Sequence, residues 1–244
     1  MKKLSIIIPI YNEEKTIIQC LNEVINVCED KLRNILDIDY EIIISNDWST
    51  DKSIMYIENF FKNKNTNFLI INNGINKWKW YAVKQWIKKS EGDFIIIQDA
   101  DLEYDPNDYI NLIEKLLNEN LDFVYGSRIR WLFKYKNSYS TLSFLIWWIL
   151  VSFIASILSF KVITDEPTCY KLFTKKLKKY LIHLEENGFE WEPAITMLLL
   201  RNKFKYDEYP IHYRARKPEE GKKIKRKDWI KAIFTLFKWR FKNI

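Results

Sequence analysis

Short apolar runs alternate with helical patterns through the first half of the chain. The apolar runs cover residues 3–9, 40–45, 68–72, 94–98 and 123–125, and the helical patterns cover 13–31, 52–63, 81–90 and 106–119. Strands that alternate with helices of about ten or more residues are typical of a mostly parallel sheet joined by right-handed crossovers. We therefore predict an α/β fold, with a Rossmann-like, mostly parallel sheet and flanking helices.

The length and composition suit one globular domain with an anionic partner. The chain has 244 residues, of which 48% are hydrophobic and 29% charged, so it can bury a substantial core. Its net charge of +7 favours an anionic partner, which could be nucleotide phosphates, an anionic membrane face or nucleic acid. The three cysteines form no Cys-x-x-Cys motif, so neither a disulfide framework nor a zinc site is predicted. The chain has no Gly-x-Gly-x-x-Gly or Walker motif, which disfavours dinucleotide dehydrogenases and P-loop enzymes.

Three acids follow the fourth apolar run at a spacing of two: Asp99, Asp101 and Glu103. In extended backbone, side chains at this spacing share one face, so the carboxylates are expected to converge. Ligands of open α/β sheets bind at the carboxyl ends of strands. Carboxylates crowded there repel one another unless a hard cation joins them, and Mg²⁺ or Mn²⁺ carrying substrate phosphates is the usual choice. The spacing therefore indicates a divalent-metal site, with a solvated acidic loop as the alternative.

Glycine is scarce and tryptophan abundant in this chain. There are 5 glycines and 10 tryptophans, whereas average usage of roughly 7% would give about 17 glycines. Trp48 stands in a turn after Asp47, where Asp-Gly is the natural pair. Some lineages read the UGA codon as glycine, so we hypothesise that several tryptophans are glycine in the native protein; a genuinely tryptophan-rich chain is the alternative. The positions concerned are Trp48, Trp78, Trp80, Trp86, Trp131, Trp147, Trp148 and Trp229.

The second half departs from the alternating pattern. Residues 142–160 form a stretch of 19 residues without a charge, which is long enough for a transmembrane helix. Its four serines and the Trp147-Trp148 pair favour a helix on the membrane surface instead, and a core helix is the third possibility. The amphipathic segment 229–241 follows a cluster of lysines and arginine, and we expect it to rest on the same anionic surface.

Seven motifs in order link the chain to a known family. They lie at residues 8–14, 46–51, 98–103, 126–128, 164–171, 188–192 and 219–223. Together they resemble the inverting glycosyltransferases of family 2, which have the GT-A fold, and within them the polyprenyl-phosphate hexosyltransferases whose type member is dolichol-phosphate mannose synthase. The resemblance implies one GT-A domain over residues 1–244. Residues 1–130 would bind the nucleotide sugar, and 131–244 would form the acceptor half, with interfacial helices at about 138–160 and 228–241.

The resemblance also implies a nucleotide-sugar site. In the family, the segment Pro-x-Tyr-Asn-Glu and an Asp-Asp-Gly-Ser turn hold the base and ribose, and a Gly-Lys-Gly loop and the Asp-x-Asp motif follow. Asn46 and Trp48 depart from the turn's first acid and its glycine. The residues carried over are Pro9, Tyr11, Glu13, Asp47, Lys79, Asp99, Ala100 and Asp101.

The same resemblance places the metal and the leaving group. Asp99 would contact the ribose or the metal, Asp101 the metal, and Glu103 would fill a third ligand position. The Mg²⁺ or Mn²⁺ ion would neutralise the charge that builds on the leaving nucleoside diphosphate. Asp99, Asp101 and Arg128 are therefore the expected catalytic residues.

The acceptor is expected to be a lipid phosphate. A phosphate monoester has a second pKa of about 6 and is mostly dianionic at neutral pH, so it needs cations rather than a general base. The resemblance gives that role to Arg128 and Arg216, with Lys222 as a further candidate, because the guanidinium fork suits phosphate oxygens. Glu190 and Glu192 would line the cleft for the sugar and acceptor.

These implications together predict an enzyme. It would move mannose or glucose, with inversion, from GDP-mannose or UDP-glucose to a polyprenyl (dolichyl or undecaprenyl) phosphate in cell envelope biogenesis. We expect it in the cytoplasm, peripherally attached to the inner membrane face, with a membrane-anchoring partner subunit and no nucleic acid. One alternative is transfer to a saccharide hydroxyl, with Asp165 or Glu166 as base. The other is a degenerate, non-catalytic module that binds a nucleotide sugar or a membrane.

Overall fold

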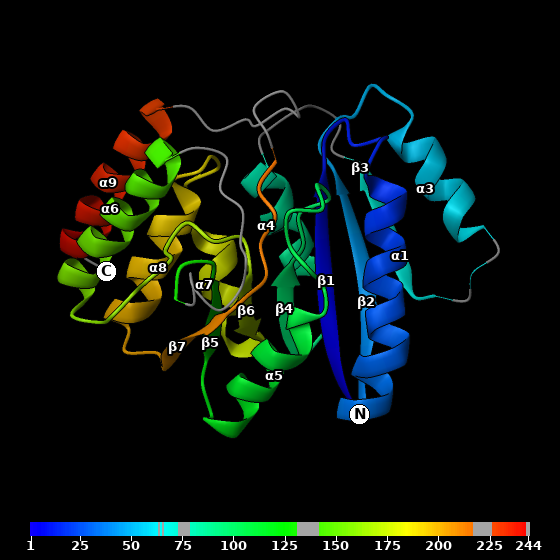
Figure 1. Ribbon diagram of the computed structural model, residues 1–244, viewed down its shortest axis with the longest axis horizontal. Helices are drawn as coiled ribbons and strands as arrows, with labels where there is room; N and C mark the ends of the chain where they lie inside the picture. The colour runs from blue at the N-terminus through cyan, green and yellow to red at the C-terminus, as the bar shows by residue number, and fades with distance from the viewer. Residues whose placement is uncertain (63, 65, 73–78, 131–141, 217–225, 243–244) are drawn as a thin grey trace.

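The structure, a computed structural model, describes residues 1–62, 64, 66–72, 79–130, 142–216 and 226–242. These residues contain a seven-stranded sheet with the order β3-β2-β1-β4-β6-β5-β7 (Figure 1). Strands β1 to β4 run parallel, as do β5 and β7, whereas β6 runs antiparallel to both of its neighbours. The predicted mostly parallel α/β sheet is thereby confirmed. The strands are β1 (Lys2–Ile10), β2 (Ile38–Asn46), β3 (Phe68–Asn72), β4 (Phe94–Ile97), β5 (Phe123–Ser127), β6 (Lys171–Thr174) and β7 (Tyr206–Pro210).

The helices predicted for the first half are present, with shifted ends. The one predicted over 13–31 is divided, because a π-helical segment, Cys28–Arg33, continues from α1. A short 3₁₀ turn, Lys175–Leu177, precedes α7. The α-helices are α1 (Ile17–Val27), α2 (Asn34–Leu36), α3 (Ser53–Phe61), α4 (Lys79–Lys89), α5 (Asp108–Asn118), α6 (Leu142–Ser159), α7 (Lys178–His183), α8 (Trp191–Arg201) and α9 (Arg226–Phe241).

The central strands form the core and align the edge where ligands bind. Ile6, Ile7 and Ile8 of β1 are fully buried, as is the middle of β4. Parallel strands covered on both faces read as continuous apolar runs, which explains why they were visible in the sequence. Ile7 pairs with Ile43 of β2 and with Ile97 of β4, so the carboxyl ends of β1, β2 and β4 meet at one edge. The loops that carry the predicted site residues start there.

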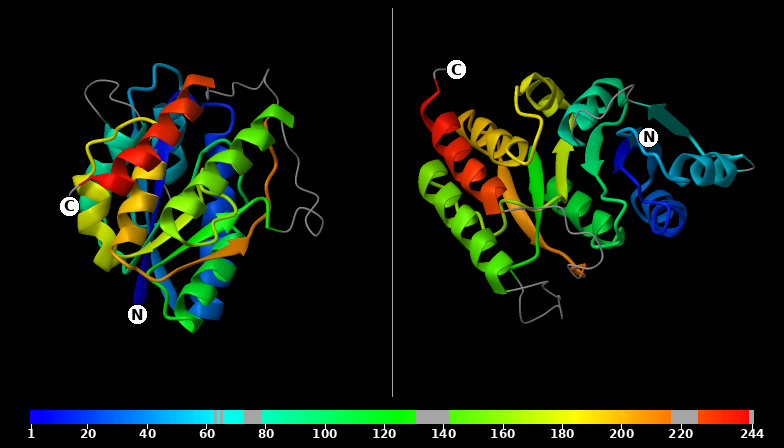
Figure 2. Two further views of the ribbon diagram at one scale, coloured as in Figure 1. Left: turned by 90° about the vertical axis from the view of Figure 1, so that its left-hand side faces the viewer. Right: turned by 90° about the horizontal axis from the view of Figure 1, so that it is seen from above.

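Three helices of the second half pack together on the side of the sheet where β5 and β7 lie (Figure 1). Contacts join α6 to α9 and both of them to α8, and Figure 2 shows α6 and α9 side by side. The helices expected at about 138–160 and 228–241 correspond to α6 and α9, although residues 138–141 lie outside the described part of the chain. No described helix combines the length and hydropathy that a membrane crossing requires.

Candidate active site

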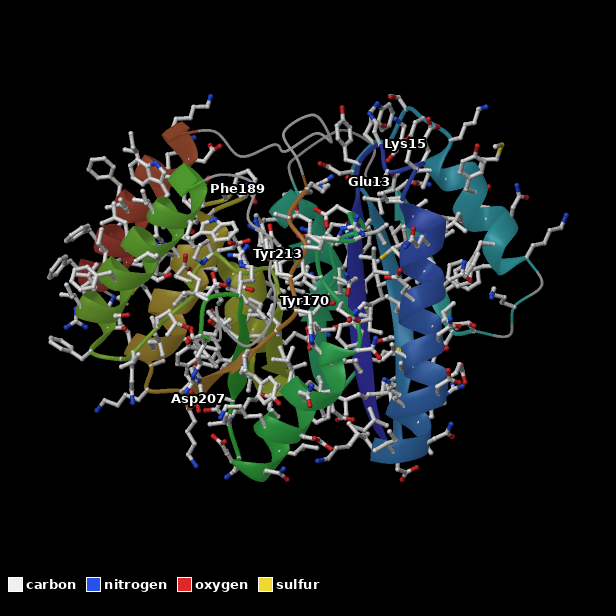
Figure 3. All side chains as sticks on the ribbon, in the orientation of Figure 1. Glu13, Lys15, Tyr170, Phe189, Asp207 and Tyr213 are labelled. Carbon is white, nitrogen blue, oxygen red and sulfur yellow. The ribbon has the colours of Figure 1, made fainter. Side chains whose placement is uncertain are left out.

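Hydrogen bonds tie the loop after β1 to the loop after β2. The amide of Asn12 donates to Oγ of Ser49 over 3.1 Å, and the amide of Thr50 donates to Oδ1 of Asn12 over 2.8 Å. The amide of Glu13 donates to Oγ of Ser53 over 2.9 Å, and Figure 3 shows Glu13 at the upper edge of the sheet. These bonds fix the two loops as one surface.

The residues predicted to hold the nucleoside gather on this surface. Pro9 pairs with Ser45 in the sheet, and the amide of Asp47 donates to the carbonyl of Ile10 over 3.0 Å. The ring of Tyr11 is half-exposed, whereas Asp47 is buried. The structure thus places Pro9, Tyr11, Glu13 and Asp47 at one edge of the sheet, and their contact with a nucleotide stays a prediction.

Trp48 has a backbone conformation that favours glycine. Its φ is 68°, in the left-handed region that costs L-residues about 1–2 kcal/mol. The ring is 52% exposed, so packing does not offset the strain. This geometry supports the hypothesis of glycine at position 48. Trp148 differs, because the Cζ atom of Arg128 lies 3.9 Å from the centroid of its ring, an environment suited to an aromatic side chain.

We expect Trp48→Gly to be more stable than Trp48→Ala by about 1 kcal/mol. Both variants remove the exposed ring, but alanine keeps the Cβ atom that strains a positive φ. Urea unfolding of the two variants and the wild type measures the difference. Equal stability of Trp48→Gly and Trp48→Ala would show that the backbone at this position is unstrained and would remove the structural support for glycine.

The three acids after β4 lie near one another, but the backbone between them is not extended as the spacing suggested. Leu102 has a φ of 61°, so the segment turns where extended backbone was expected. The carboxylate of Glu103 instead accepts from the hydroxyl of Tyr213 over 2.7 Å and from the amide of Arg216 over 2.9 Å. No group of three metal-binding side chains occurs among the residues that the structure describes. The role of Glu103 as a third metal ligand stays a prediction.

Asp101 is an acid in surroundings rich in negative charge. Burial, followed by the charges of Asp99 and Glu103, raises the pKa of Asp101 to about 7, and the nearby guanidinium of Arg216 opposes the shift. Oδ2 of Asp101 lies 2.6 Å from Nη2 of Arg216, and Oδ1 accepts from the amide of Glu103 over 3.2 Å. A carboxylate whose neighbours disfavour its charge binds a cation readily, because the cation removes that penalty.

Asp99 and Asp101 are the residues that would hold a divalent ion shared with a substrate. Mg²⁺ is usually held by one or two carboxylates together with substrate phosphates, and both side chains offer hard oxygen ligands beside buried Ala100. These two carboxylates would supply part of the coordination of such an ion, and a substrate diphosphate and water would supply the rest.

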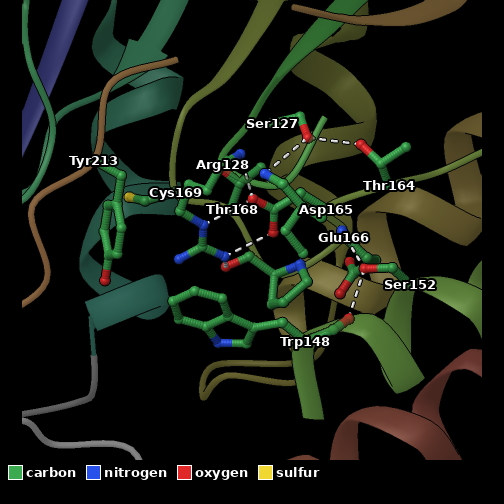
Figure 4. Close-up of polar contacts among 12 residues, drawn as sticks. Ser127, Arg128, Trp148, Ser152, Thr164, Asp165, Glu166, Thr168, Cys169 and Tyr213 are labelled. Carbon is green, nitrogen blue, oxygen red and sulfur yellow. Dashed lines mark hydrogen bonds and ion pairs between the residues drawn. The ribbon is translucent and has the colours of Figure 1, made fainter. Parts of the chain in front are cut away.

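Arg128 is buried at the end of β5 in an ion pair. Its Nε donates to Oδ2 of Asp165 and its Nη2 to Oδ1, each over 2.7 Å, and Nη2 also donates to the carbonyl of Pro167 over 2.9 Å (Figure 4). Burial disfavours the charge of Arg128, but the carboxylate of Asp165 outweighs it and raises the pKa of the guanidinium. The guanidinium group of Arg128 is therefore bound to the loop at 165–167 in this structure. Binding of the acceptor phosphate by Arg128 stays a prediction, and it requires this pair to open.

Both carboxyl groups proposed as a general base are also buried. Asp165 is fully buried and faces Arg128. Glu166 is fully buried, accepts from the hydroxyl of Thr196 over 3.0 Å, and has its pKa raised by burial. A base must reach the proton that it removes. The geometry of this loop therefore disfavours a mechanism that needs Asp165 or Glu166 as base.

The other predicted residues lie in different settings. Arg216 contacts the acid segment through Asp101, so the structure does bring it to the site. Glu192 is buried in the first turn of α8, and the amide of Gly188 donates to Oε1 of Glu190 over 3.3 Å. Lys222 lies outside the described residues. Lys79 begins α4, but its side chain is not described.

Tyr213 was not among the residues predicted for the site. Tyr213 forms an isolated antiparallel bridge with Tyr104, and its hydroxyl binds Glu103, which lies 110 positions earlier in the chain. Its ring packs edge-on to that of Trp148 on α6, with centroids 5.7 Å apart. A tyrosine between a histidine and an arginine fits no motif, so no local pattern could have identified it.

Known proteins with similar sequences transfer sugars. The family model described as glycosyl transferase family 2 matches residues 5–181. A dolichyl-phosphate beta-glucosyltransferase of Trichomonas vaginalis is 26% identical over 96% of this chain and 72% of its own length. The corresponding enzyme of Dictyostelium discoideum is 29% identical over 78% of this chain and 60% of its own. An undecaprenyl-phosphate 4-deoxy-4-formamido-L-arabinose transferase of Proteus mirabilis is 30% identical over 53% of this chain and 38% of its own.

Solved structures share the fold. Glucosyl-3-phosphoglycerate synthase of Mycobacterium tuberculosis in complex with UDP has a TM-score of 0.68 at 16% identity, over 98% of this chain and 80% of that one. A crystal structure of S. aureus TarS, residues 1–349, has a TM-score of 0.63 at 18% identity, over 98% of this chain and 72% of that one. At such identities the likeness shows the arrangement of the sheet and helices alone.

Proposed function

The chain belongs to glycosyl transferase family 2, and on that basis we propose that it moves a hexose from a nucleoside diphosphate sugar to a polyprenyl phosphate, with inversion. That it is a glycosyltransferase follows from its family and relatives. Glucose and UDP-glucose are favoured over mannose and GDP-mannose, because relatives that cover most of the chain are named dolichyl-phosphate beta-glucosyltransferases.

The burial of Asp165 and Glu166 is the observation that supports a phosphate acceptor. A saccharide hydroxyl must lose its proton to a base as it attacks, whereas a phosphate monoester is mostly dianionic at neutral pH. Both carboxyl groups proposed as a base are buried and lie away from solvent. An acceptor that needs no base suits this geometry better.

The residues at the carboxyl edge of the sheet would have separate roles in the transfer reaction. The bond between the sugar's anomeric carbon and the diphosphate oxygen breaks as an acceptor phosphate oxygen attacks from the opposite face. Asp99 and Asp101 would hold Mg²⁺ or Mn²⁺, which stabilises negative charge on the leaving diphosphate. Arg216 lies beside these acids and supplies a guanidinium suited to phosphate oxygens. Tyr11 and Asp47 would hold the nucleoside.

The test is an assay with undecaprenyl phosphate in detergent and a panel of labelled sugar nucleotides, with and without Mg²⁺. We expect label from UDP-glucose in a lipid that mild acid cleaves, and loss of that label with EDTA. Label that enters only a saccharide would favour the hydroxyl acceptor. Binding of a sugar nucleotide without turnover, in the wild type and in Trp48→Gly, would favour the non-catalytic module.

We further propose that α6 and α9 rest on an anionic membrane at its inner face. Large apolar side chains on these helices and the turn after α6 point to solvent, and Phe153, Phe160 and Phe234 are 60%, 81% and 70% exposed. α6 carries no charge. Lys161 follows α6 in the sequence, Lys231 lies within α9, and both side chains are exposed. An apolar face with basic residues beside it suits the boundary of headgroups and acyl chains. The exposed set is Ile146, Ile149, Leu150, Phe153, Ile157, Phe160, Val162, Ile230, Phe234, Phe237 and Phe241.

We expect the double variant Phe153→Ser/Phe234→Ser to lose at least about tenfold in binding to phosphatidylglycerol vesicles, since burying each ring is worth about 1.5–3 kcal/mol. Flotation of the protein with the vesicles measures the loss. Ile35→Ser, which removes an apolar side chain that is 61% exposed on α2, serves as the matched control. Equal flotation of the double variant and the wild type would exclude this face as the membrane contact.

A further inference from the structure

The segment Tyr213–Arg216 follows the acid segment in antiparallel contact, and Glu103 holds it there. The amide of Arg214 donates to the carbonyl of Glu103 over 2.9 Å, and the amide of Arg216 donates to its Oε1 over 2.9 Å. The hydroxyl of Tyr213 donates to Oε2 over 2.7 Å. Both oxygens of the Glu103 carboxylate thus position this segment.

This arrangement places the guanidinium of Arg216 on the carboxylate that the donor site needs. Nη2 of Arg216 lies 2.6 Å from Oδ2 of Asp101, and its Nε lies 3.4 Å from Oε1 of Glu103. The side chains of Arg216 and Asp101 are only 20% and 10% exposed, so water screens this pair weakly. Arg216 therefore neutralises Asp101 in the free protein.

A divalent ion and Arg216 compete for the same oxygens. Mg²⁺ needs a carboxylate oxygen at about 2.0–2.1 Å, and it repels a guanidinium held on the same carboxylate. Oδ1 of Asp101 already accepts the amide of Glu103, and Oδ2 accepts Arg216. Each oxygen keeps a further lone pair for a metal, but the positive charge of the ion would weaken the pair of Asp101 with Arg216.

We propose that Arg216 is a displaceable counter-ion of the donor site, positioned by Glu103 and Tyr213. It occupies Asp101 in the free enzyme and leaves when the metal and donor diphosphate bind. The released guanidinium then lies beside two phosphorylated substrates, where its charge is needed. This inference rests on the proposed function through the assignment of a divalent ion to Asp101. It adds an order of events: Arg216 is available to substrate phosphate only after the donor site is filled.

The experiment measures the Kd of Mn²⁺ alone by calorimetry, without any sugar nucleotide. We expect Arg216→Ala to bind Mn²⁺ about tenfold more tightly than the wild type, although the variant transfers sugar more slowly. Arg214→Ala is the matched control, because it removes an exposed arginine from the same segment, and we expect a change of less than about twofold. Repeating the titration at about 0.5 M salt screens long-range charge effects, and the difference between the two variants should persist.

A charge-neutral variant tests the positioning role. Tyr213→Phe removes the hydroxyl that holds Glu103 but leaves every charge in place. We expect it to tighten Mn²⁺ binding about two- to threefold, because Arg216 is held less firmly on Asp101. A loss of structure alone would weaken binding, so the direction of the change separates positioning from damage.

The outcomes separate this inference from the proposed function. Equal Mn²⁺ affinity of the wild type, Arg216→Ala and Tyr213→Phe would overturn the counter-ion role, even if Mn²⁺ and UDP-glucose bind together and support transfer. Absence of Mn²⁺ binding in all three proteins, with and without UDP-glucose, would overturn the metal assignment and the proposed chemistry with it. Tighter binding in both variants, with Arg214→Ala unchanged, would support the inference.

Discussion

Asp101→Asn is expected to lower kcat/KM for sugar transfer by about 10³-fold, while the protein remains folded. The amide keeps the shape of the side chain but removes the charge that a metal and diphosphate require, and loss of one preorganised electrostatic contact to a developing charge costs about 10²–10³ in rate. Stability should change little, because the substitution also relieves repulsion from Asp99 and Glu103. Steady-state kinetics and urea unfolding measure the two effects.

Glu114→Gln is the control for this prediction, since it removes an exposed carboxylate from α5 near the same part of the sequence. It should leave both kcat/KM and stability unchanged. Wild-type rates in Asp101→Asn would remove Asp101 from the mechanism. A low rate that merely follows unfolding of the variant would show a structural role instead.

Arg128→Ala is expected to lower the free energy of unfolding by about 3–5 kcal/mol, because it leaves Asp165 as a buried charge without its partner. Asp165 is fully buried and bonds two nitrogens of the guanidinium. Arg33, which pairs with Glu29 and Asp39 at the surface, offers the matched control, since all three side chains are about 40% exposed. Arg33→Ala should cost less than about 1 kcal/mol. Urea unfolding of both variants gives the comparison.

A second variant of Arg128 tests whether this residue also binds the acceptor phosphate. Arg128→Lys keeps the charge but loses the planar fork that matches Asp165. If Arg128 holds the loop, stability and use of both substrates should fall together in Arg128→Lys. A variant with wild-type stability and donor affinity that has lost only the use of lipid phosphate would assign Arg128 to the acceptor site.

The sheet could be predicted from the sequence because its cause is local. β1 and β4 are buried on both faces, so their residues form unbroken apolar runs, and the intervening helices repeat their apolar positions regularly. β6 and β7 were not predicted, because they are short and contain charged residues such as Lys171 and Glu208, which are buried here by partners elsewhere. Their place in the sheet depends on pairing with β4 and β5.

In the candidate site, too, some features followed from the sequence and others depended on tertiary contacts. That Asp47 and Asp99 lie at one edge follows from the sequence, since each comes just after a strand and parallel strands end at the same edge. The backbone conformation between Asp101 and Glu103 did not follow, because the left-handed residue Leu102 interrupts the extended spacing that the prediction assumed. The partners of Glu103 lie in the segment Tyr213–Arg216, more than 100 positions later in the chain.

The sequence by itself determined the fold class, the family and the edge at which the donor site lies, because periodicity, strand ends and motif order are properties of neighbouring residues. Only the tertiary structure decided the partners of the charged side chains. Arg128 meets Asp165 across 37 positions and Arg216 meets Asp101 across 115. Nothing local distinguishes such partners, since a buried charge is paired by whichever opposite charge the folded chain brings within reach.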